Sequence, residues 1–131
     1  MSKSVPVVFI NCSRHPFLDQ IMRRHKRKLY ETRTRNTLGA LAGARAYLAE
    51  TGHGPSMCRC SAIIGAPVVA RSRKEWNALR SMHRVPRGSA YDWHPWTKVK
   101  YLYPITDVVA CTPFHPEEGV RHGRVWMETI I

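Results

Sequence analysis

The sequence predicts an α+β fold in which many short strands form a small β-barrel, plugged or flanked by two helices. Three observations lead to this prediction. Short segments rich in β-branched and aromatic residues recur along the 131 residues and are separated by turn residues. Two other segments carry apolar residues at helical spacing. Apolar residues make up 44% of the chain, enough for the core of a single domain spanning residues 1–131.

Strands are expected wherever the apolar runs are short. In chain order they cover residues 6–12, 28–37, 45–51, 57–64, 68–70, 99–103, 107–111 and 124–130. Pro67 predicts a break between the fourth and fifth of these, and Pro104 predicts a bulge or an edge position. Residues 36–44 contain two glycines and are either a loop or a short helix.

Two helices are expected. Pro16 fits the first position of one, which has an apolar face and ends near His25 in a basic run. Ser72 and Glu75 form a capping box that opens the other, which stops before Pro86. The loops that follow these strands and helices include an aromatic-rich one at 87–96 and another at 113–119. The apolar helix positions are Phe17, Leu18, Ile21 and Met22 in the first helix, and Trp76, Leu79 and Met82 in the second.

The charge balance indicates the class of partner. The chain has 21 Lys and Arg against 9 acidic residues, a formal net charge of +12, which favours a polyanion such as RNA or another nucleic acid. An anionic membrane is the rival, but no basic amphipathic helix and no membrane-spanning apolar run stand out. The first six residues lack the apolar stretch of a signal peptide. We therefore expect a soluble, cytoplasmic protein without a membrane partner, and its oligomeric state stays open.

The four cysteines are expected to be free thiols, because nothing marks the protein as secreted. Cys58 and Cys60 are separated by one residue, whereas zinc motifs usually have two. On a strand both would lie on one face, where thiols pack well in a core. Core packing is thus favoured over metal binding, and no metal or cofactor is predicted.

The stretch from residue 28 to 37 is the centre of the functional prediction. Residues two apart on a strand share a face. One face would therefore carry Leu29, Glu31, Arg33 and Arg35. Two arginines and a carboxylate are costly to bury unless they bind each other or a ligand. A solvated edge strand explains the same pattern, so this segment alone leaves both interpretations open.

The order of several stretches resembles a known family. A helix with Ile21 runs into a basic turn, then into Lys28-Leu29-Tyr30-Glu31-Thr32-Arg33 and Asn36-Thr37, and later come Leu48-Ala49-Glu50-Thr51 and Val125-Trp126. Over roughly residues 7–130 this resembles the ASCH (activating signal cointegrator homology) family of PUA-like domains, whose pattern is Lys-x-x-Glu-x-Arg. The family's glycine before the lysine is absent, and His25-Lys26-Arg27 stands there instead.

The resemblance implies a fold, a cleft and two kinds of activity. The fold would be a mixed, mostly antiparallel PUA-like β-barrel with two to three flanking helices and a cleft beside the Lys28–Arg33 strand. Members of the family are thought to bind RNA or modified nucleotides, and some are ribonucleases. An acetylcytidine amidohydrolase branch pairs the motif lysine with a threonine three residues on. That position is Glu31 here, which argues against the same mechanism.

The leading hypothesis is a nucleic-acid-binding module that takes an unpaired or modified base. Lys28, Arg33 and Arg35 would hold phosphate. Glu31 would orient an arginine or accept a hydrogen bond from a base. The remaining candidates are Asn36, which follows the strand, and the loop aromatics Tyr91, Trp93 and Trp96, which either stack on bases or close the end of the barrel.

The alternative is a hydrolase acting on RNA or a modified nucleoside. Lys28 and Glu31 would be its catalytic acid and base, assisted by Tyr103 or by a histidine such as His15 or His94. A protein-interaction module is a third possibility, but nothing in the sequence points to the large exposed apolar patch it would need. The sequence does not decide between a binder and an enzyme.

Overall fold

The structure is a computed structural model, and it describes residues 4–116, 121–122 and 126–130. Its helices are α1 (Phe17–Met22), α2 (Arg73–Ala78) and α3 (Arg80–His83), with a 3₁₀ turn, η1, at Gly39–Leu41. Its strands are β1 (Ser4–Asn11), β2 (Tyr30–Arg33), β3 (Arg45–Thr51), β4 (Met57–Ile64), β5 (Val68–Ala70), β6 (Lys100–Phe114), β7 (Arg121–His122) and β8 (Trp126–Ile130).

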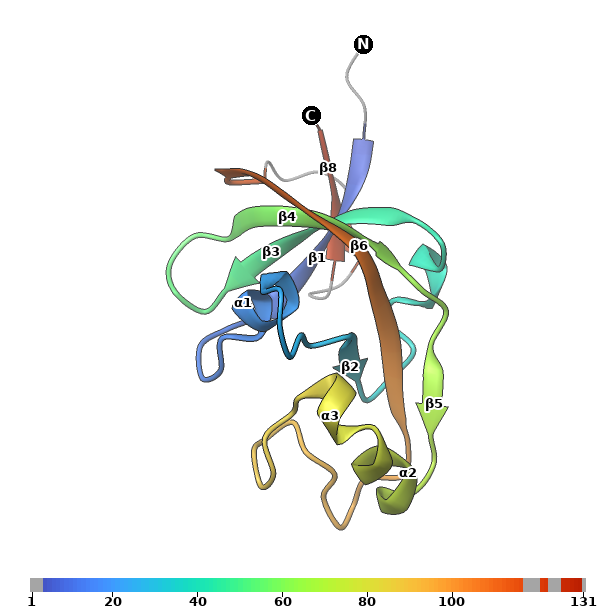
Figure 1. The fold of residues 1–131 in the computed structure, drawn as a ribbon. Helices are drawn as coiled ribbons and strands as arrows, with labels where there is room; N and C mark the ends of the chain where they lie inside the picture. The colour runs from blue at the N-terminus through green and yellow to red at the C-terminus, as the bar shows by residue number, and fades with distance from the viewer. Residues whose placement is uncertain (1–3, 117–120, 123–125, 131) are drawn as a thin grey trace.

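The strands form one mixed, mostly antiparallel sheet. Their order is β2-β6-β4-β3-β1-β8-β7, and β5 pairs with β6 outside that path. β1 and β3 run parallel, whereas every other recorded pair is antiparallel. The α+β class, the mixed sheet and the short helices are therefore as predicted (Figure 1).

The sheet is not closed, and this corrects the expectation of a β-barrel. Among the described residues, no strand pairing joins β2 to β1 or to the far end of the sheet. β2 has four residues and pairs with β6 alone. Just before β2, the backbone N–H groups of Lys28 and Leu29 donate to the carbonyls of Gln20 and Met82. Those bonds tie this segment to the ends of α1 and α3, so the sheet stays open between β1 and β2.

Strand β6 holds the two parts of the sheet together. Its first residues pair with β2 and β5, and its later residues pair with β4 through shifts of register. Two separate strands were predicted here, at 99–103 and 107–111, but they form one continuous strand (Figure 1). Pro104 lies inside it, and Asp107 has a φ of 50°, where the register shifts. The irregularity is thus three residues beyond the proline.

The main core lies between α1 and the sheet. It is built from the inward residues of β1, β3, β4 and β6, together with Phe17, Leu18 and Ile21 of α1. A separate cluster forms around Trp76 of α2 and Leu102 of β6. Cys58 and Cys60 are both free and buried, but they pack in different clusters because a bulge separates them. The shared face predicted for them was wrong for this reason.

Several predicted boundaries change in the structure. The first helix ends at Met22, before His25, and the strand expected over 28–37 shrinks to Tyr30–Arg33. The N-cap half of the capping box is confirmed, since the Ser72 hydroxyl accepts a hydrogen bond from the Glu75 N–H at 3.1 Å. The Glu75 carboxylate accepts at 2.9 Å from the N–H of Arg71, one residue before the N-cap. Residues 117–119 of the predicted loop, and 124–125 of the predicted last strand, lie outside the described residues. No helix within the described ranges is long and apolar enough to cross a membrane.

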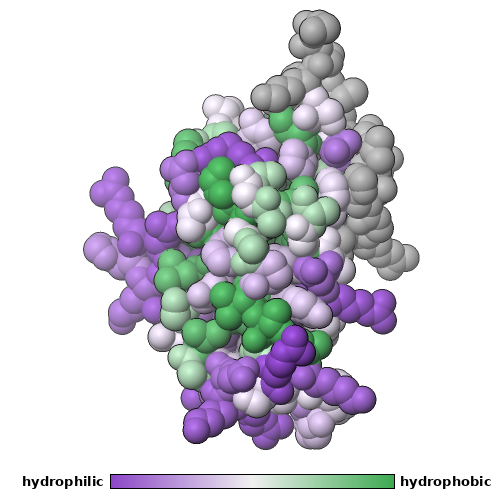
Figure 2. All heavy atoms as spheres, turned by 90° about the vertical axis from the view of Figure 1, so that its right-hand side faces the viewer, coloured by the Kyte–Doolittle hydropathy of each residue, from purple (hydrophilic) through white to green (hydrophobic). Residues whose placement is uncertain are grey.

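Apolar and hydrophilic side chains cover different parts of one side of the molecule. Figure 2 shows apolar and neutral side chains gathered over the middle of this face, whereas hydrophilic side chains cover its lower end. The lower end in both views is where α2 and α3 lie (Figure 1). Exposed large apolar side chains among the described residues are Leu29, Val68, Trp96 and Val109.

Candidate nucleic-acid site

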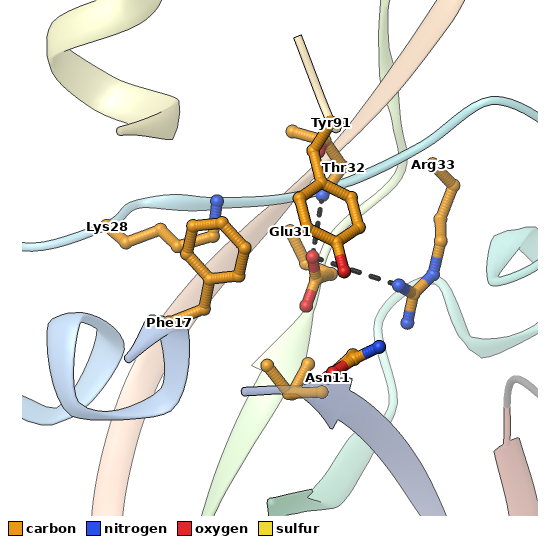
Figure 3. A pocket seen from close by; sticks show the side chains of 8 residues that line it. Asn11, Phe17, Lys28, Glu31, Thr32, Arg33 and Tyr91 are labelled. Carbon is orange, nitrogen blue, oxygen red and sulfur yellow. Dashed lines mark hydrogen bonds and ion pairs between the residues drawn. The ribbon is translucent and has the colours of Figure 1, made fainter. Parts of the chain in front are cut away.

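A small pocket occupies the opening between β1 and β2, where the sheet fails to close. Its volume is about 30 Å³. Glu31 stands at its centre, with Lys28 on one side and Arg33 on the other (Figure 3). The lining residues are Ile10, Asn11, Phe17, Lys28, Glu31, Thr32, Arg33 and Tyr91. The structure thus brings together the lysine, glutamate and arginine of the predicted pattern.

Glu31 is buried, with 5% of its surface exposed, and its carboxylate is only half satisfied. Oε1 accepts a hydrogen bond from the Thr32 backbone N–H at 3.0 Å and lies 3.9 Å from Arg33 Nη1. Oε2 is buried and has no hydrogen-bond partner within the described part of the chain. A buried carboxylate oxygen without a donor is costly, so its presence indicates a site for a hydrogen-bond donor.

Lys28 is more deeply buried, with 1% of its surface exposed. Its Nζ donates to the backbone carbonyl of His83 at 2.5 Å and lies 4.6 Å from the centroid of the Phe17 ring. Burial lowers the pKa of Lys28 to about 8, although the nearby Glu31 carboxylate favours the charged form. Near neutral pH a larger fraction of this amine is therefore unprotonated than in an ordinary lysine.

Arg33 connects the pocket to the opposite strand. Its Nη2 donates to the backbone carbonyl of Phe9 in β1 at 3.0 Å. This contact spans the gap in the sheet, where a backbone ladder would otherwise run. Its Nε is buried and has no partner within the described ranges. The guanidinium thus fixes the width of the opening and faces Glu31 (Figure 3).

Aromatic rings form the remaining wall. Phe17 and Tyr91 pack edge to face, with ring centroids 5.6 Å apart, and His15 lies 5.3 Å from Phe17. Tyr91 comes from the long loop before β6, and its carbonyl accepts a hydrogen bond from Lys100 at 3.0 Å. The loop ring is therefore held over the pocket by a buried side chain of β6.

A larger, open groove begins where β2 ends. It has a volume of about 840 Å³ and includes Arg35 and Trp96 among its walls. Trp96 is 75% exposed and stacks on His94, with centroids 4.6 Å apart and planes 11° from parallel. The groove is lined by Thr34, Arg35, Ala90, His94, Trp96, Thr97, Lys98, Val99 and Lys100. Arg35 thus lies at this neighbouring groove and is not among the residues that line the pocket.

Of the predicted nucleic-acid-binding residues, Asn36 and Trp93 line neither the pocket nor the groove. Asn36 accepts a hydrogen bond from the Tyr103 hydroxyl at 2.7 Å, and that hydroxyl in turn accepts from the Leu38 N–H at 3.2 Å. Trp93 packs against the Trp76 cluster and lines a separate cavity.

The sequence did not predict that the backbone carbonyl of His83 binds the Lys28 ammonium. The His83 ring is buried and stacks on Trp76 with centroids 3.8 Å apart, and burial lowers its pKa to about 4. Nδ1 accepts from the Val85 N–H at 2.9 Å, so Nε2 donates to the Trp76 carbonyl at 3.1 Å. No local pattern could have shown that the carbonyl of this residue holds Lys28.

The site offers acid–base groups, cations and rings, without a metal-binding cluster. Within the described ranges, no group of three or more His, Cys, Asp or Glu side chains is arranged to hold a metal ion. At the pocket, Lys28 and Glu31 can transfer protons and form hydrogen bonds beside the positive charge of Arg33.

Comparisons with known proteins show which solved structures have a similar fold. No model of a known protein family matches the sequence, and no curated protein matches it either. By structure, the chain is similar to solved ASCH structures from Zymomonas mobilis. The ASCH crystal structure has 18% identity and a TM-score of 0.67 over 84% of this chain and 72% of that one. A serine-to-alanine variant of it has 16% identity and a TM-score of 0.69 over 93% and 85%.

The open, mixed sheet and its flanking helices thus define an α+β domain. More narrowly, the chain has the fold of an ASCH domain.

Proposed function

We propose that the protein binds nucleic acid, with an unpaired or modified base of RNA as the preferred ligand at the pocket between β1 and β2. The observation that carries this proposal is the Glu31 carboxylate, which is buried beside two cations, yet its Oε2 has no donor among the residues that the structure describes. The N–H groups on a base edge are suitable donors for such an oxygen.

The size of the pocket restricts what enters it. A volume of about 30 Å³ is about the share of one water molecule. A complete base is larger, so only an edge or a small substituent fits beside Glu31. The remainder of the base would lie against Tyr91, which stands at the pocket wall and provides an aromatic face.

The groove beside the pocket suits the backbone of the same strand. Arg35 and Lys98 are exposed cations in a groove of about 840 Å³, and the exposed ring of Trp96 lies among them. Alternating cations and rings are typical of surfaces that bind single strands. Arg35 would contact phosphate, and Trp96 would stack on a neighbouring base.

The test is binding of a labelled RNA oligonucleotide, measured by anisotropy at several salt concentrations. Glu31→Gln is expected to weaken binding about tenfold, since the amide presents a donor where the ligand donates. Arg35→Ala should lower the salt dependence by the slope of one phosphate contact, about 0.7 for a single strand. Glu128→Gln, a carboxylate on β8, is the matched control. Binding that is level in salt and equal in all variants contradicts the proposal.

A second candidate function is hydrolysis of RNA or of a modified nucleoside by Lys28 and Glu31. The observation that favours it is the Lys28 pKa of about 8, which suits proton transfer near neutral pH. Glu31 would accept a proton from the attacking water molecule, and the Lys28 ammonium would donate a proton to the leaving group.

Turnover separates the two functions. Wild type and Glu31→Gln are incubated with labelled RNA and, separately, with acetylated nucleosides, and products are measured over time. Turnover that Glu31→Gln abolishes supports a hydrolase. Tight binding of RNA without product supports the binding module alone.

A further inference from the structure

Part of the positive charge lies far along the chain from the pocket. Residues 71–87 contain six Lys and Arg (positions 71, 73, 74, 80, 84 and 87) and a single acidic residue, Glu75. This segment forms α2, α3 and the turn after them, at the end of the molecule that is covered by hydrophilic side chains (Figures 1 and 2). Such a concentration of positive charge attracts an anionic ligand.

Three of these arginines converge on one cavity. It has a volume of about 180 Å³ and lies between the two helices and the loop that follows them. The walls are formed by Arg73, Asn77, Arg80, Arg87, Asp92 and Trp93. The cavity thus combines guanidinium groups, an amide and an indole ring, which together can bind a phosphate and the group attached to it.

The one carboxylate in the cavity is already saturated. Asp92 accepts hydrogen bonds from Trp76 Nε1 at 2.7 Å, from Arg80 Nη2 at 2.9 Å and from the Gly88 N–H at 2.8 Å. Arg80 also donates to the Val85 carbonyl and to Asn77 Oδ1, at 2.7 Å and 2.6 Å. The Asp92–Arg80 pair therefore forms a neutral, rigid floor.

The other two arginines are unused. Arg73 and Arg87 are exposed, and neither side chain has a hydrogen-bond or ion-pair partner within the described ranges. Since the floor is neutral, these two guanidinium groups leave the cavity with an excess of positive charge. Trp93 is half-buried against the Trp76 cluster, so its ring is fixed at the wall.

We infer that this cavity is a phosphate-binding site in which Arg73 and Arg87 hold the phosphate group and Trp93 contacts the attached sugar or base. The phosphate comes either from a free nucleotide or from a nucleic-acid strand, because both offer the same oxygens to the two guanidinium groups. The site is separate from the pocket and groove: Asp92 and Trp93 line the cavity, whereas His94 and Trp96 line the groove.

The test follows the Trp93 side-chain resonance by NMR in the full chain. Inorganic phosphate, uridine 5′-monophosphate and an RNA oligonucleotide are added in separate titrations. A shift with phosphate or the mononucleotide assigns a free-phosphate site, and a shift with RNA alone assigns the strand as the source. Absence of any Trp93 shift with all three probes overturns the inference.

Substitutions of Arg73 and Arg87 test whether these two residues bind the phosphate. Arg73→Ala with Arg87→Ala is expected to weaken the response of Trp93 by about tenfold or more, because two charge-assisted contacts are lost. Arg71→Ala with Lys74→Ala removes the same two positive charges from exposed positions that do not line the cavity, and should leave the response unchanged. Equal losses in both proteins would reveal nonspecific attraction and overturn the assignment.

The Trp93 response tests the phosphate cavity independently of the pocket at Glu31. Glu31→Gln should leave the Trp93 response to mononucleotide intact, whatever it does to binding of RNA at the groove. Arg87→Gln alone provides a milder variant, expected to weaken the response about threefold to tenfold. Failure of this site would thus leave the proposed function standing, and failure of the pocket would leave this site standing.

Discussion

The ammonium group of Lys28 donates to the backbone carbonyl of His83 at 2.5 Å, across 55 residues of sequence. This contact joins the candidate pocket to α3, and it places an ionisable amine where 1% of the residue's surface is exposed. The helix terminus is itself fixed by the His83 ring, which stacks on Trp76. The position of the Lys28 amine therefore depends on the packing of α2 and α3.

The depressed pKa of Lys28 predicts how stability changes with pH. Between about pH 8 and 10.5 the unfolded chain holds the Lys28 proton while the folded protein has released it, so stability rises with pH across that window. The full effect corresponds to about 3 kcal/mol. Lys28→Met should abolish this part of the alkaline rise, as measured by urea unfolding at pH 7 and pH 10. An identical pH dependence in the two proteins would contradict the prediction.

Local patterns predicted part of the fold correctly. β4 spans the predicted residues, Met57–Ile64, because its alternate positions are buried, although the bulge between Cys58 and Cys60 divides those buried side chains between two clusters. The N-cap at Ser72 was also predicted correctly, since its hydrogen bond joins residues three apart in sequence. Such features depend on residues a few positions apart.

The sequence predicted only those features of the candidate site that depend on residues close together in the chain. Glu31 and Arg33 were predicted to share a face from their spacing, and Lys28 was added by the resemblance to Lys-x-x-Glu-x-Arg, but the period of two stops at Arg33 because the strand ends there. Arg35 accordingly lines the groove. Phe17 and His83 were missed as site residues, because their contacts with Lys28 depend on tertiary packing.

The open sheet was not predicted for the same reason, because it also depends on tertiary contacts. Pairing between β1 and β2 is replaced by one side-chain contact from Arg33 to the Phe9 carbonyl. Nothing in the two sequence segments distinguishes a ladder from this substitute.

Asp92 is expected to be a major contributor to stability at neutral pH. Burial alone would raise its pKa, but hydrogen bonds from Gly88, Trp76 and Arg80 outweigh it and lower the pKa well below its usual range. Its stabilisation is therefore present above about pH 4 and lost as the pH falls. Asp92→Asn should cost about 3 kcal/mol at pH 7 and flatten the acid limb of the stability profile.

Chemical unfolding at pH 7 and pH 3 measures the effect of Asp92→Asn. Asp107→Asn is the comparison, because that carboxylate is mostly exposed and pairs with Arg45 at the surface. It should change the free energy of unfolding by less than about 1 kcal/mol. Equal losses for the two variants would show that the buried network around Asp92 has no special role.

The Tyr103 hydroxyl and Asn36 are expected to stabilise the protein as a pair. Tyr103→Phe removes the donor to Asn36 and the acceptor of the buried Leu38 N–H, at a cost of about 1–2 kcal/mol. Asn36→Ala should cost less, and the double variant should show a coupling of about 1 kcal/mol. Tyr101→Phe, on the same strand, provides the control. Strictly additive losses would mean that the two side chains do not interact.

Trp96 is expected to contribute to binding and not to folding. Its ring is 75% exposed, so Trp96→Ala should change the free energy of unfolding by less than about 0.5 kcal/mol. If the ring stacks on a base in the groove, the same variant should weaken binding of single-stranded RNA by about 1–3 kcal/mol. Anisotropy and thermal unfolding on one preparation measure both quantities.

Trp96→Phe separates stacking from simple loss of surface. The smaller ring still offers a π-face beside His94, so it should retain most of the affinity that Trp96→Ala loses. Wild-type affinity in Trp96→Ala would remove the groove from the proposed RNA path and leave the base-edge pocket at Glu31 to act alone. Equal weakening by alanine and phenylalanine would instead point to the indole N–H, because both substitutions remove that donor.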